Sequence, residues 1–183
     1  MHNSLRCYHF SNMYMSSIQV GIQSAHAQMA MFVKYDKAEA VNLDTIPEYA
    51  PTVDECLFID STKMLYEWAT NHQTMICLNG GYLENMKAIA AHLTHDVNPF
   101  PWSTFHESQE AMGGMLTNIA IVLPDRIYDT AAWLRNPRNQ LVTYDGDPNY
   151  YYPPEANTDY HNIGFTWWEG EFMDMLNKCG LAK

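Results

Sequence analysis

The sequence has no apolar run that approaches the roughly 18–20 residues needed to cross a bilayer. Its N-terminal segment is interrupted by His, Ser and Asn and lacks the apolar core of a secretory signal. It also has no phosphate-binding loop, no dinucleotide-binding glycine motif, no zinc-type ligand spacing and no internal repeat. These absences predict a cytoplasmic protein that stays off the membrane and works without a metal or an organic cofactor.

Cysteine is scarce and scattered. The four cysteines, Cys7, Cys56, Cys77 and Cys179, lie far apart and form no C-x-x-C pair. Spacing of this kind predicts free, buried thiols and argues against a disulfide framework or a zinc site.

Positive charge is also scarce, because ten Lys and Arg residues stand against 21 Asp and Glu residues, for a net charge of −11. Proteins bind nucleic acid largely by neutralising phosphates with Lys and Arg, and the ten here are scattered. A tRNA substrate would therefore have to bind a local patch against an unfavourable overall field.

Hydrophobic residues, by contrast, make up 47% of the 183 residues, which is enough for a substantial core. Strands are predicted at 7–14, 74–78, 103–106 and 115–123, and helices at 17–35, 61–69, 82–94, 126–135 and near the C-terminus. Alternating strands and helices predict an α/β sheet with helices on its faces. Residues 1–135 are expected to form this domain.

Two segments do not fit the alternating pattern. Residues 36–60 are acidic and contain two prolines, so they are predicted to be an irregular insertion or a functional loop. Residues 136–183 are rich in aromatic residues and too short to bury much core alone. They are predicted to form a C-terminal extension, ending in a helix, that packs on the domain.

The helix predicted at 17–35 carries two adjacent stripes. Ser16 or Ser17 could cap it. Its apolar positions are spaced four, three, four and three, at Ile18, Ile22, Ala25, Met29 and Phe32. This helical period predicts that the apolar stripe faces the core. Gln19, Gln23 and His26 form the neighbouring polar stripe, which is expected at the rim of a cleft.

Three segments follow one another in order: Gln23-Ser24-Ala25-His26-Ala27; Trp68-x-x-Asn71 with the strand Thr74–Leu78; and Phe105-x-Glu107 with Gly113-Gly114-Met115-Leu116-Thr117-Asn118-Ile119-Ala120. In this order and spacing they resemble the archaeal- and eukaryotic-type peptidyl-tRNA hydrolases, in particular the short bacterial and phage-type branch. The resemblance covers roughly two-thirds of the chain. It implies a three-layer sandwich with a mixed four-stranded sheet between helices, a homodimer, and cleavage of the ester that joins a peptide to tRNA.

The chain departs from the family pattern at several positions. The family has a lysine seven positions before the helix histidine, where this chain has Gln19. The short branch also tends to have glutamine at this position. Tyr14 stands where the family has an acidic residue at the end of the first strand. The stretch before Gly113 is longer than usual, so Glu107 and Glu110 are both candidates for the acidic position.

Ester hydrolysis needs an activated water and donors for the developing oxyanion. Glu107, Glu110 or His26 could act as the base, and Gln19, Gln23 and Thr117 could orient the water or stabilise the oxyanion. The backbone of Gly113 and Gly114 could approach a substrate closely. These residues also have structural explanations. His26 could bond a backbone carbonyl, and Thr117 suits a strand because it is β-branched. Gly113 and Gly114 could form a turn, and Gln19 and Gln23 could belong to a solvated helix face.

Two functions follow. The first is a hydrolase in which Gln19, His26, Glu107 and Thr117 surround the ester, while Gln23, Gly113 and Gly114 bind the substrate. The second is a catalytically inactive module of the same fold that binds a protein partner, suggested by Gln19 at the lysine position and by the acidic charge.

Overall fold

The computed structural model describes residues 4–36, 52–135 and 165–182. The chain divides into two compact units, one formed by Met1–Pro124 with Cys179–Lys183 and the other by Asp125–Lys178. The fold is α/β, as predicted. No helix within the described residues is long and apolar enough to cross a membrane.

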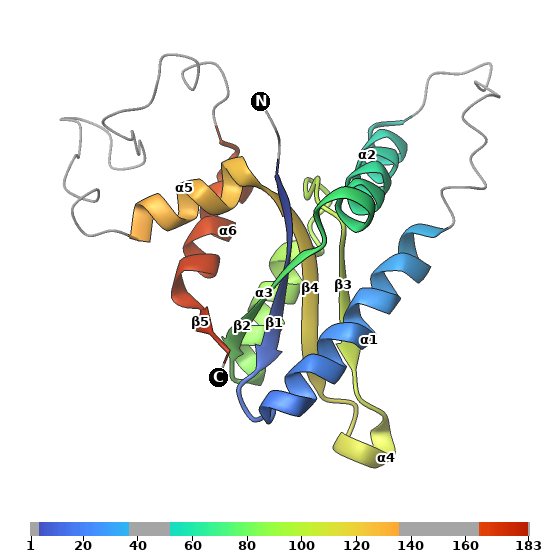
Figure 1. The fold of residues 1–183 in the computed structure, drawn as a ribbon, viewed down its shortest axis with the longest axis vertical. Helices are drawn as coiled ribbons and strands as arrows, with labels where there is room; N and C mark the ends of the chain where they lie inside the picture. Colours follow the sequence, from blue (N-terminus) through green and yellow to red (C-terminus); the bar gives the residue numbers. More distant parts are fainter. Residues whose placement is uncertain (1–3, 37–51, 136–164, 183) are drawn as a thin grey trace. The chain divides into compact units, whose positions relative to one another are not determined.

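The elements follow one another along the chain as shown in Figure 1. They are β1 (Leu5–Asn12), α1 (Ser17–Tyr35), α2 (Val53–Glu67), the π-helix η2 (Trp68–His72), β2 (Thr74–Gly81), α3 (Leu83–Leu93), β3 (Trp102–His106), α4 (Gln109–Met112), β4 (Leu116–Pro124), α5 (Asp125–Arg135), α6 (Trp167–Lys178) and β5 (Gly180–Leu181).

The sheet of the first unit is open and mixed, with five strands in the order β3-β4-β1-β2-β5. β1 runs parallel to β2 and antiparallel to β4. Four strands were predicted, and the fifth, β5, pairs with β2 through Leu181 and Gly180. Two residues are too few to show an alternating pattern, so nothing in the sequence indicated this strand.

β4 is buried along its whole length, as expected for an apolar strand that is covered on both faces. On one face, Cys7 of β1 and Val122 of β4 pack with Met31 of α1 and Leu65 of α2. Side chains alternate along a strand, so Phe10 points to the other face, where the Sδ atom of Met86 in α3 lies close to Gly80 beside it. Helices therefore contact both faces of the sheet.

α1 buries a different face from the one predicted. The buried residues of α1 are Val20, Gln23, Ser24, Ala27, Met31 and Tyr35. The predicted stripe is wrong, because Ile18, Ile22 and Met29 are exposed. The polar side chains of Gln23 and Ser24 find hydrogen-bond partners on the sheet, so the face that carries them packs inward.

α2 begins earlier than predicted. Thr52 and Glu55 form a capping box, in which the Thr52 side chain accepts from the Glu55 N–H and the Glu55 carboxylate accepts from the Thr52 N–H. Residues 53–60 are therefore helical, not irregular. The rest of the predicted insertion, 37–51, lies outside the described residues, as does most of the predicted extension, 136–164.

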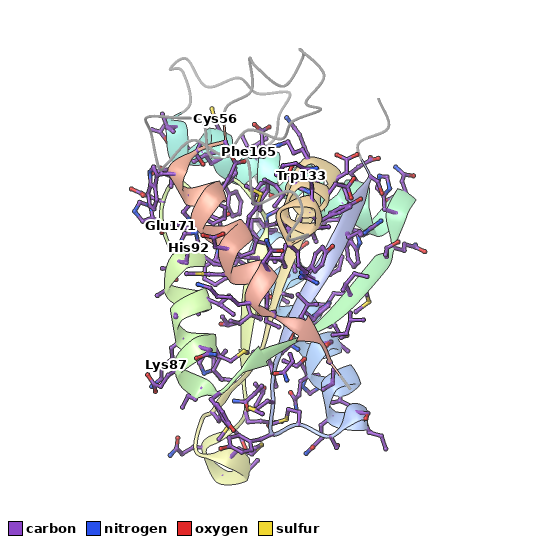
Figure 2. All side chains as sticks on the ribbon, turned by 90° about the vertical axis from the view of Figure 1, so that its left-hand side faces the viewer. Cys56, Lys87, His92, Trp133, Phe165 and Glu171 are labelled. Carbon is purple, nitrogen blue, oxygen red and sulfur yellow. The ribbon has the colours of Figure 1, made fainter. Side chains whose placement is uncertain are left out.

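All four cysteines are free thiols, as predicted. Cys7 and Cys179 are buried and Cys77 is half-buried, but Cys56 is exposed near the start of α2, so its predicted burial is wrong (Figure 2). Because the sequence pattern predicts a helix only from residue 61, it does not indicate which side of a helix Cys56 lies on.

The second unit contains α5 and α6. The predicted terminal helix is present as α6, with Trp168, Phe172 and Leu176 buried. The rings of Trp168 and Phe172 stack with centroids 5.4 Å apart. Arg126 of α5 forms an ion pair with the buried Glu169 of α6, and this contact links the two helices.

Candidate functional site

The carboxyl ends of the parallel strands β1 and β2, the end of β3, the start of β4 and the first turn of α1 all lie at one end of the sheet (Figure 1). There Asn12 donates from Nδ2 to the carbonyl of Leu116 at 3.4 Å, and the Glu107 N–H donates to the carbonyl of Met115 at 3.0 Å. In α/β sheets, crevices outside the carboxyl ends of strands are common ligand sites.

Gln23 joins helix α1 to two residues of the sheet. Its side chain is 5% exposed. The amide Nε2 donates to Oε1 of Glu107, and the amide Oε1 accepts from the Thr117 hydroxyl at 3.4 Å. The same hydroxyl also lies 3.3 Å from the carbonyl oxygen of Phe105, so its proton is shared between the two acceptors. The structure therefore brings three of the candidate site residues together. The idea that Gln23 belongs to a solvated helix face is wrong.

A β-bulge explains how Thr117 reaches α1. Phe105 pairs with Asn118 and His106 pairs with Leu116, so Thr117 is the extra residue on β4. Thr117 and Asn118 consequently both hydrogen-bond to α1, to Gln23 and Ser24 respectively. A bulge of this kind re-aims a side chain that would otherwise point to the other face.

The two candidate carboxylates have different surroundings. Glu107 is half-buried directly after β3, and its Oε2 accepts from the Ser108 N–H at 3.3 Å. A carboxylate offers about four acceptor positions, so room remains for a water. Glu110 is exposed on the single turn of α4. The contact with Gln23 therefore singles out Glu107.

His26 and Gln19 lie on the exposed part of α1. The ring of His26 packs edge-on against Phe105, with centroids 4.5 Å apart, and so it flanks the strand that leads to Glu107. Gln19 completes the capping box of α1, because its Oε1 accepts from the N–H and the hydroxyl of Ser16, each at 2.9 Å. The side-chain oxygen of Gln19 therefore caps the first turn of α1.

Gly113 and Gly114 form the turn before β4. Both have positive φ angles, 61° and 71°, which only glycine adopts without strain. The Gly113 N–H donates to the carbonyl of Gln109, and the Gly114 N–H donates to the carbonyl of Ser108. These amides are used inside the turn, so the two glycines shape the backbone and present no free N–H group to a ligand.

A buried polar chain lies beside this site and was not anticipated from the sequence. Asn118 donates from Nδ2 to the hydroxyls of Ser11 (2.9 Å) and Ser24 (3.2 Å), and its Oδ1 contacts Nδ1 of His9 at 3.1 Å. Because Oδ1 can only accept, Nδ1 of His9 carries the proton. Nε2 of His9 is then the acceptor facing the Cys7 thiol, 3.3 Å away.

Burial sets the protonation of this chain. It lowers the pKa of His9 to about 4, although the hydrogen bond that His9 donates to Asn118 acts in the opposite direction. Burial also raises the pKa of the Cys7 thiol far above its usual value, with Cys77 adding to the effect. Cys7 is therefore a protonated hydrogen-bond donor and not an activated nucleophile. The alternating pattern of β1 could not show that His9 and Ser11 would meet Asn118 on β4.

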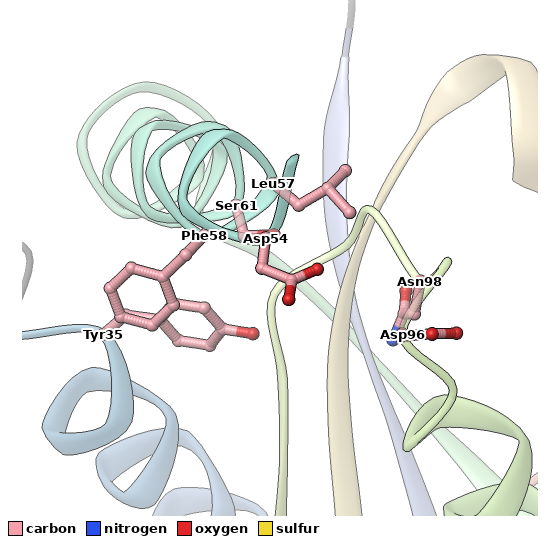
Figure 3. Close-up of a pocket in the computed structure, with 7 residues that line it drawn as sticks. All are labelled: Tyr35, Asp54, Leu57, Phe58, Ser61, Asp96 and Asn98. Atoms are coloured by element: carbon pink, nitrogen blue, oxygen red, sulfur yellow. The ribbon is translucent and has the colours of Figure 1, made fainter. Parts of the chain in front are cut away.

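Two pockets lie in the described part of the first unit. One, of about 240 Å³, lies at the site end of the sheet and is lined by Ser11, Asn12, Met13, Met15, Val20, Asn79, Leu181 and Ala182. The other, of about 220 Å³, lies at the far end of α1, where the Tyr35 hydroxyl and the Asp54 carboxylate point into it (Figure 3). Within the described ranges, no three His, Cys, Asp or Glu residues come together as a metal site would require.

Comparison with known proteins gave no match, either to a family model or to a curated protein.

Proposed function

We propose that this chain is a peptidyl-tRNA hydrolase-like enzyme that cleaves the ester between a peptide and tRNA, with Glu107 as the general base. The observation that carries the proposal is the contact of Gln23 with both Glu107 and Thr117. In this proposal the family's four strands correspond to β1–β4, layered between α1 and α2 on one side and α3 on the other.

The mechanism assigns one task to each side chain. Glu107 takes a proton from a water that attacks the ester carbonyl carbon. The bond to the ribose oxygen then breaks, and Glu107 returns its proton to that oxygen. Gln23 holds the Glu107 carboxylate in place. Thr117 is fully buried, so it acts as a positioning residue. Its hydroxyl donates to the Gln23 side-chain oxygen and so orients the amide with its N–H groups facing Glu107. The proposal assigns donation to the ester oxygens to His26, which is exposed and packs against Phe105.

The charge pattern limits how the substrate is recognised. No Lys or Arg occurs in residues 7–33 or 88–124, which form most of the sheet and the site. In this proposal the protein therefore binds the peptide ester and the terminal nucleotide, and not the phosphates of the tRNA body. Tyr14 and Tyr82, exposed after β1 and β2 with ring centroids 5.4 Å apart, offer faces on which a base can stack.

Hydrolysis of a peptidyl-tRNA by matched variants tests the proposal. E107Q keeps the shape of the side chain but removes the base, so kcat should fall by about 100-fold or more. E110Q makes the same change on the neighbouring exposed carboxylate and should leave kcat within about twofold of the wild type. Failure of the wild-type protein to release peptide, or an equal loss in both variants, would refute the assignment.

A non-catalytic module that binds a protein partner is the second candidate. The observation that favours it is the absence of Lys and Arg from residues 7–33 and 88–124, together with exposed apolar side chains on α1. A pull-down separates the two functions. Tight, salt-resistant capture of a protein without retention of peptidyl-tRNA would favour the binding module, whereas retention of peptidyl-tRNA would favour the hydrolase.

A further inference from the structure

The pocket of about 240 Å³ at the site end of the sheet has an uncharged wall. Residues of β1, β2, β5 and the first turn of α1 line it, and none of these described residues is Asp, Glu, Lys, Arg or His. Sites for drug-sized ligands usually measure about 300–1,000 Å³, so this pocket suits a smaller ligand, such as a single ring system. A charged group placed in it would find no opposite charge, which favours a neutral ligand.

Two polar side chains in the pocket keep a hydrogen-bond donor that no other described residue uses. Ser11 is 1% exposed, and its Oγ accepts from Nδ2 of Asn118 at 2.9 Å, which leaves the hydroxyl proton available. Asn79 is exposed, and its Oδ1 accepts from the Gly81 N–H at 2.9 Å, which leaves Nδ2 available. A purely apolar ligand would cover these donors without pairing them, at a cost in free energy. The pocket therefore favours a ligand with acceptor atoms.

A pair of tyrosines lies beside the pocket. Met13 and Met15 both line the pocket, and Tyr14 stands between them in the chain. Tyr82 follows Gly81, whose carbonyl accepts from the Met13 N–H at 3.0 Å. Tyr14 is 69% exposed and Tyr82 53%, with ring centroids 5.4 Å apart. Exposed aromatic faces of this kind stack on flat heterocycles, so the neutral ligand with acceptor atoms is best matched by a nucleobase.

The side-chain amide of Asn79 indicates which base. The Gly81 N–H identifies Oδ1, because an N–H group can only meet an acceptor. Oδ1 keeps a second lone pair next to the available Nδ2, so the amide offers an acceptor and a donor side by side. Adenine presents the complementary pair, the N6 amino group and the acceptor N7, which asparagine binds in DNA recognition. A base with oxygen at position 6 presents two acceptors on that edge and does not match.

The pocket adjoins the contact between Gln23 and Glu107. Val20 lines the pocket, and Gln23 follows three residues later on the same buried stripe of α1, a rise of about 4.5 Å. Asn12, also in the pocket wall, donates from Nδ2 to the carbonyl of Leu116 at the start of β4. A ribose separates its base from its 3′ oxygen by a comparable distance. One nucleoside can therefore extend from the pocket to the proposed site.

We propose that this pocket binds the adenine base of an adenosine. The Asn79 amide pairs with N6 and N7, the Ser11 hydroxyl donates to another ring nitrogen, and the tyrosine pair supplies the stacking face. The source of the adenosine rests on the proposed function, because in a peptidyl-tRNA it is the terminal nucleoside that carries the ester. The binding itself needs no turnover, so free adenosine is a sufficient probe.

Isothermal titration calorimetry with adenosine and inosine tests the proposal. The wild-type chain should bind adenosine with a dissociation constant of roughly 0.1–1 mM, as suits a ligand of this size. Inosine carries an oxygen in place of the N6 amino group, so it should bind at least about tenfold more weakly. Adenosine 5′-monophosphate should bind no more tightly than adenosine, because the chain has a net charge of −11.

Matched variants locate the binding. N79D keeps an oxygen for the Gly81 N–H but removes the Nδ2 donor, so adenosine should bind at least about tenfold more weakly. N71D makes the same change on the exposed Asn71 of η2 and should bind adenosine like the wild type. Circular dichroism checks that both variants are folded.

The outcomes separate this proposal from the proposed function. Adenosine binding by a chain that does not hydrolyse peptidyl-tRNA would retain the pocket and reject the hydrolase. In an active chain, N79D should raise KM for peptidyl-tRNA at least about tenfold with little change in kcat, because the base contact is the same in the ground and transition states. A wild-type chain that does not bind adenosine at about 10 mM, equal affinities for adenosine and inosine, or N79D that binds like the wild type would each overturn the adenine site.

Discussion

Asn118 uses both ends of its side-chain amide inside the fold. Its N–H groups bind the hydroxyls of Ser11 and Ser24, and its oxygen fixes the proton of His9 on Nδ1. Polar groups that are buried without such partners cost free energy. The buried hydrogen-bond network is therefore stable only while each of its residues keeps its protonation state. His9 is the member that changes state first as the pH falls, because its pKa of about 4 lies within reach of mild acid.

The stability of the protein should therefore fall in mild acid. His9 has a pKa of about 4 in the folded state, compared with 6.5 for the unperturbed residue. Between these values the unfolded chain binds the proton and the folded chain does not. The contribution of His9 is thus complete above pH 6.5 and is lost as the pH falls toward 4.

Urea unfolding at a series of pH values measures this effect. The free energy of unfolding should drop by roughly 3 kcal/mol between the two pKa values in the wild type. H9Q removes the titrating group, so its unfolding free energy should change less over the same interval. An equal change in both proteins would show that His9 is not responsible.

At the scale of elements, the bulge in β4 is the device that joins α1 to the site. Thr117→Val keeps the shape of the side chain but removes the hydroxyl that binds Gln23. We expect a loss of about 1–2 kcal/mol in stability, because the Gln23 oxygen is left without this donor. We also expect kcat to fall about tenfold with little change in KM, because Gln23 no longer holds Glu107 in one orientation.

Two further variants separate positioning from packing. Thr117→Ser restores the hydroxyl and should restore kcat, which a purely structural role for the methyl group would not allow. Thr104→Val makes the same change at a half-buried position on β3 and should leave kcat unaltered. A Thr117→Val protein with wild-type kcat would remove Thr117 from the mechanism.

Most elements of the fold were predictable, but the orientation of α1 was not. Its apolar stripe of Ile18, Ile22 and Met29 has an ideal helical period, and periodicity cannot tell a face that packs on the sheet from one that packs elsewhere. The start of α2 could have been predicted, because Thr52 and Glu55 show the spacing of a capping box.

The candidate site was predictable only in part. The resemblance pointed to Gln23, Glu107 and Thr117, and the structure brings these three together. The choice between Glu107 and Glu110 needed the fold, because both follow β3 at similar distances along the chain. The buried chain of His9 and Asn118 depends on the pairing of β1 with β4, which one sequence does not reveal.

For the whole molecule, net charge governs the encounter with an anionic substrate. A protein that makes six to ten phosphate contacts typically loses about 10³–10⁵ in affinity between 50 and 200 mM salt. With a net charge of −11 and no Lys or Arg in residues 7–33 and 88–124, this chain should behave differently. KM for a peptidyl-tRNA should stay level or decrease over that range, since salt screens the repulsion.

Steady-state kinetics at several salt concentrations check this expectation, with kcat as the internal reference. A KM that rises steeply with salt would instead reveal a phosphate-binding surface. Such a surface would have to include cationic residues outside the ranges 7–33 and 88–124.

The position of β1 in the sheet has a consequence for how the chain is made. β1 leaves the ribosome before both of its neighbours, because Cys7 pairs with Met75 on one side and with Val122 on the other. One edge of β1 can pair once β2 has been synthesised, but the other edge stays open until β4 has been made. Open apolar edges invite pairing between nascent chains. A lower growth temperature or a higher chaperone capacity should thus raise the yield of folded protein more than the change of any single surface residue does.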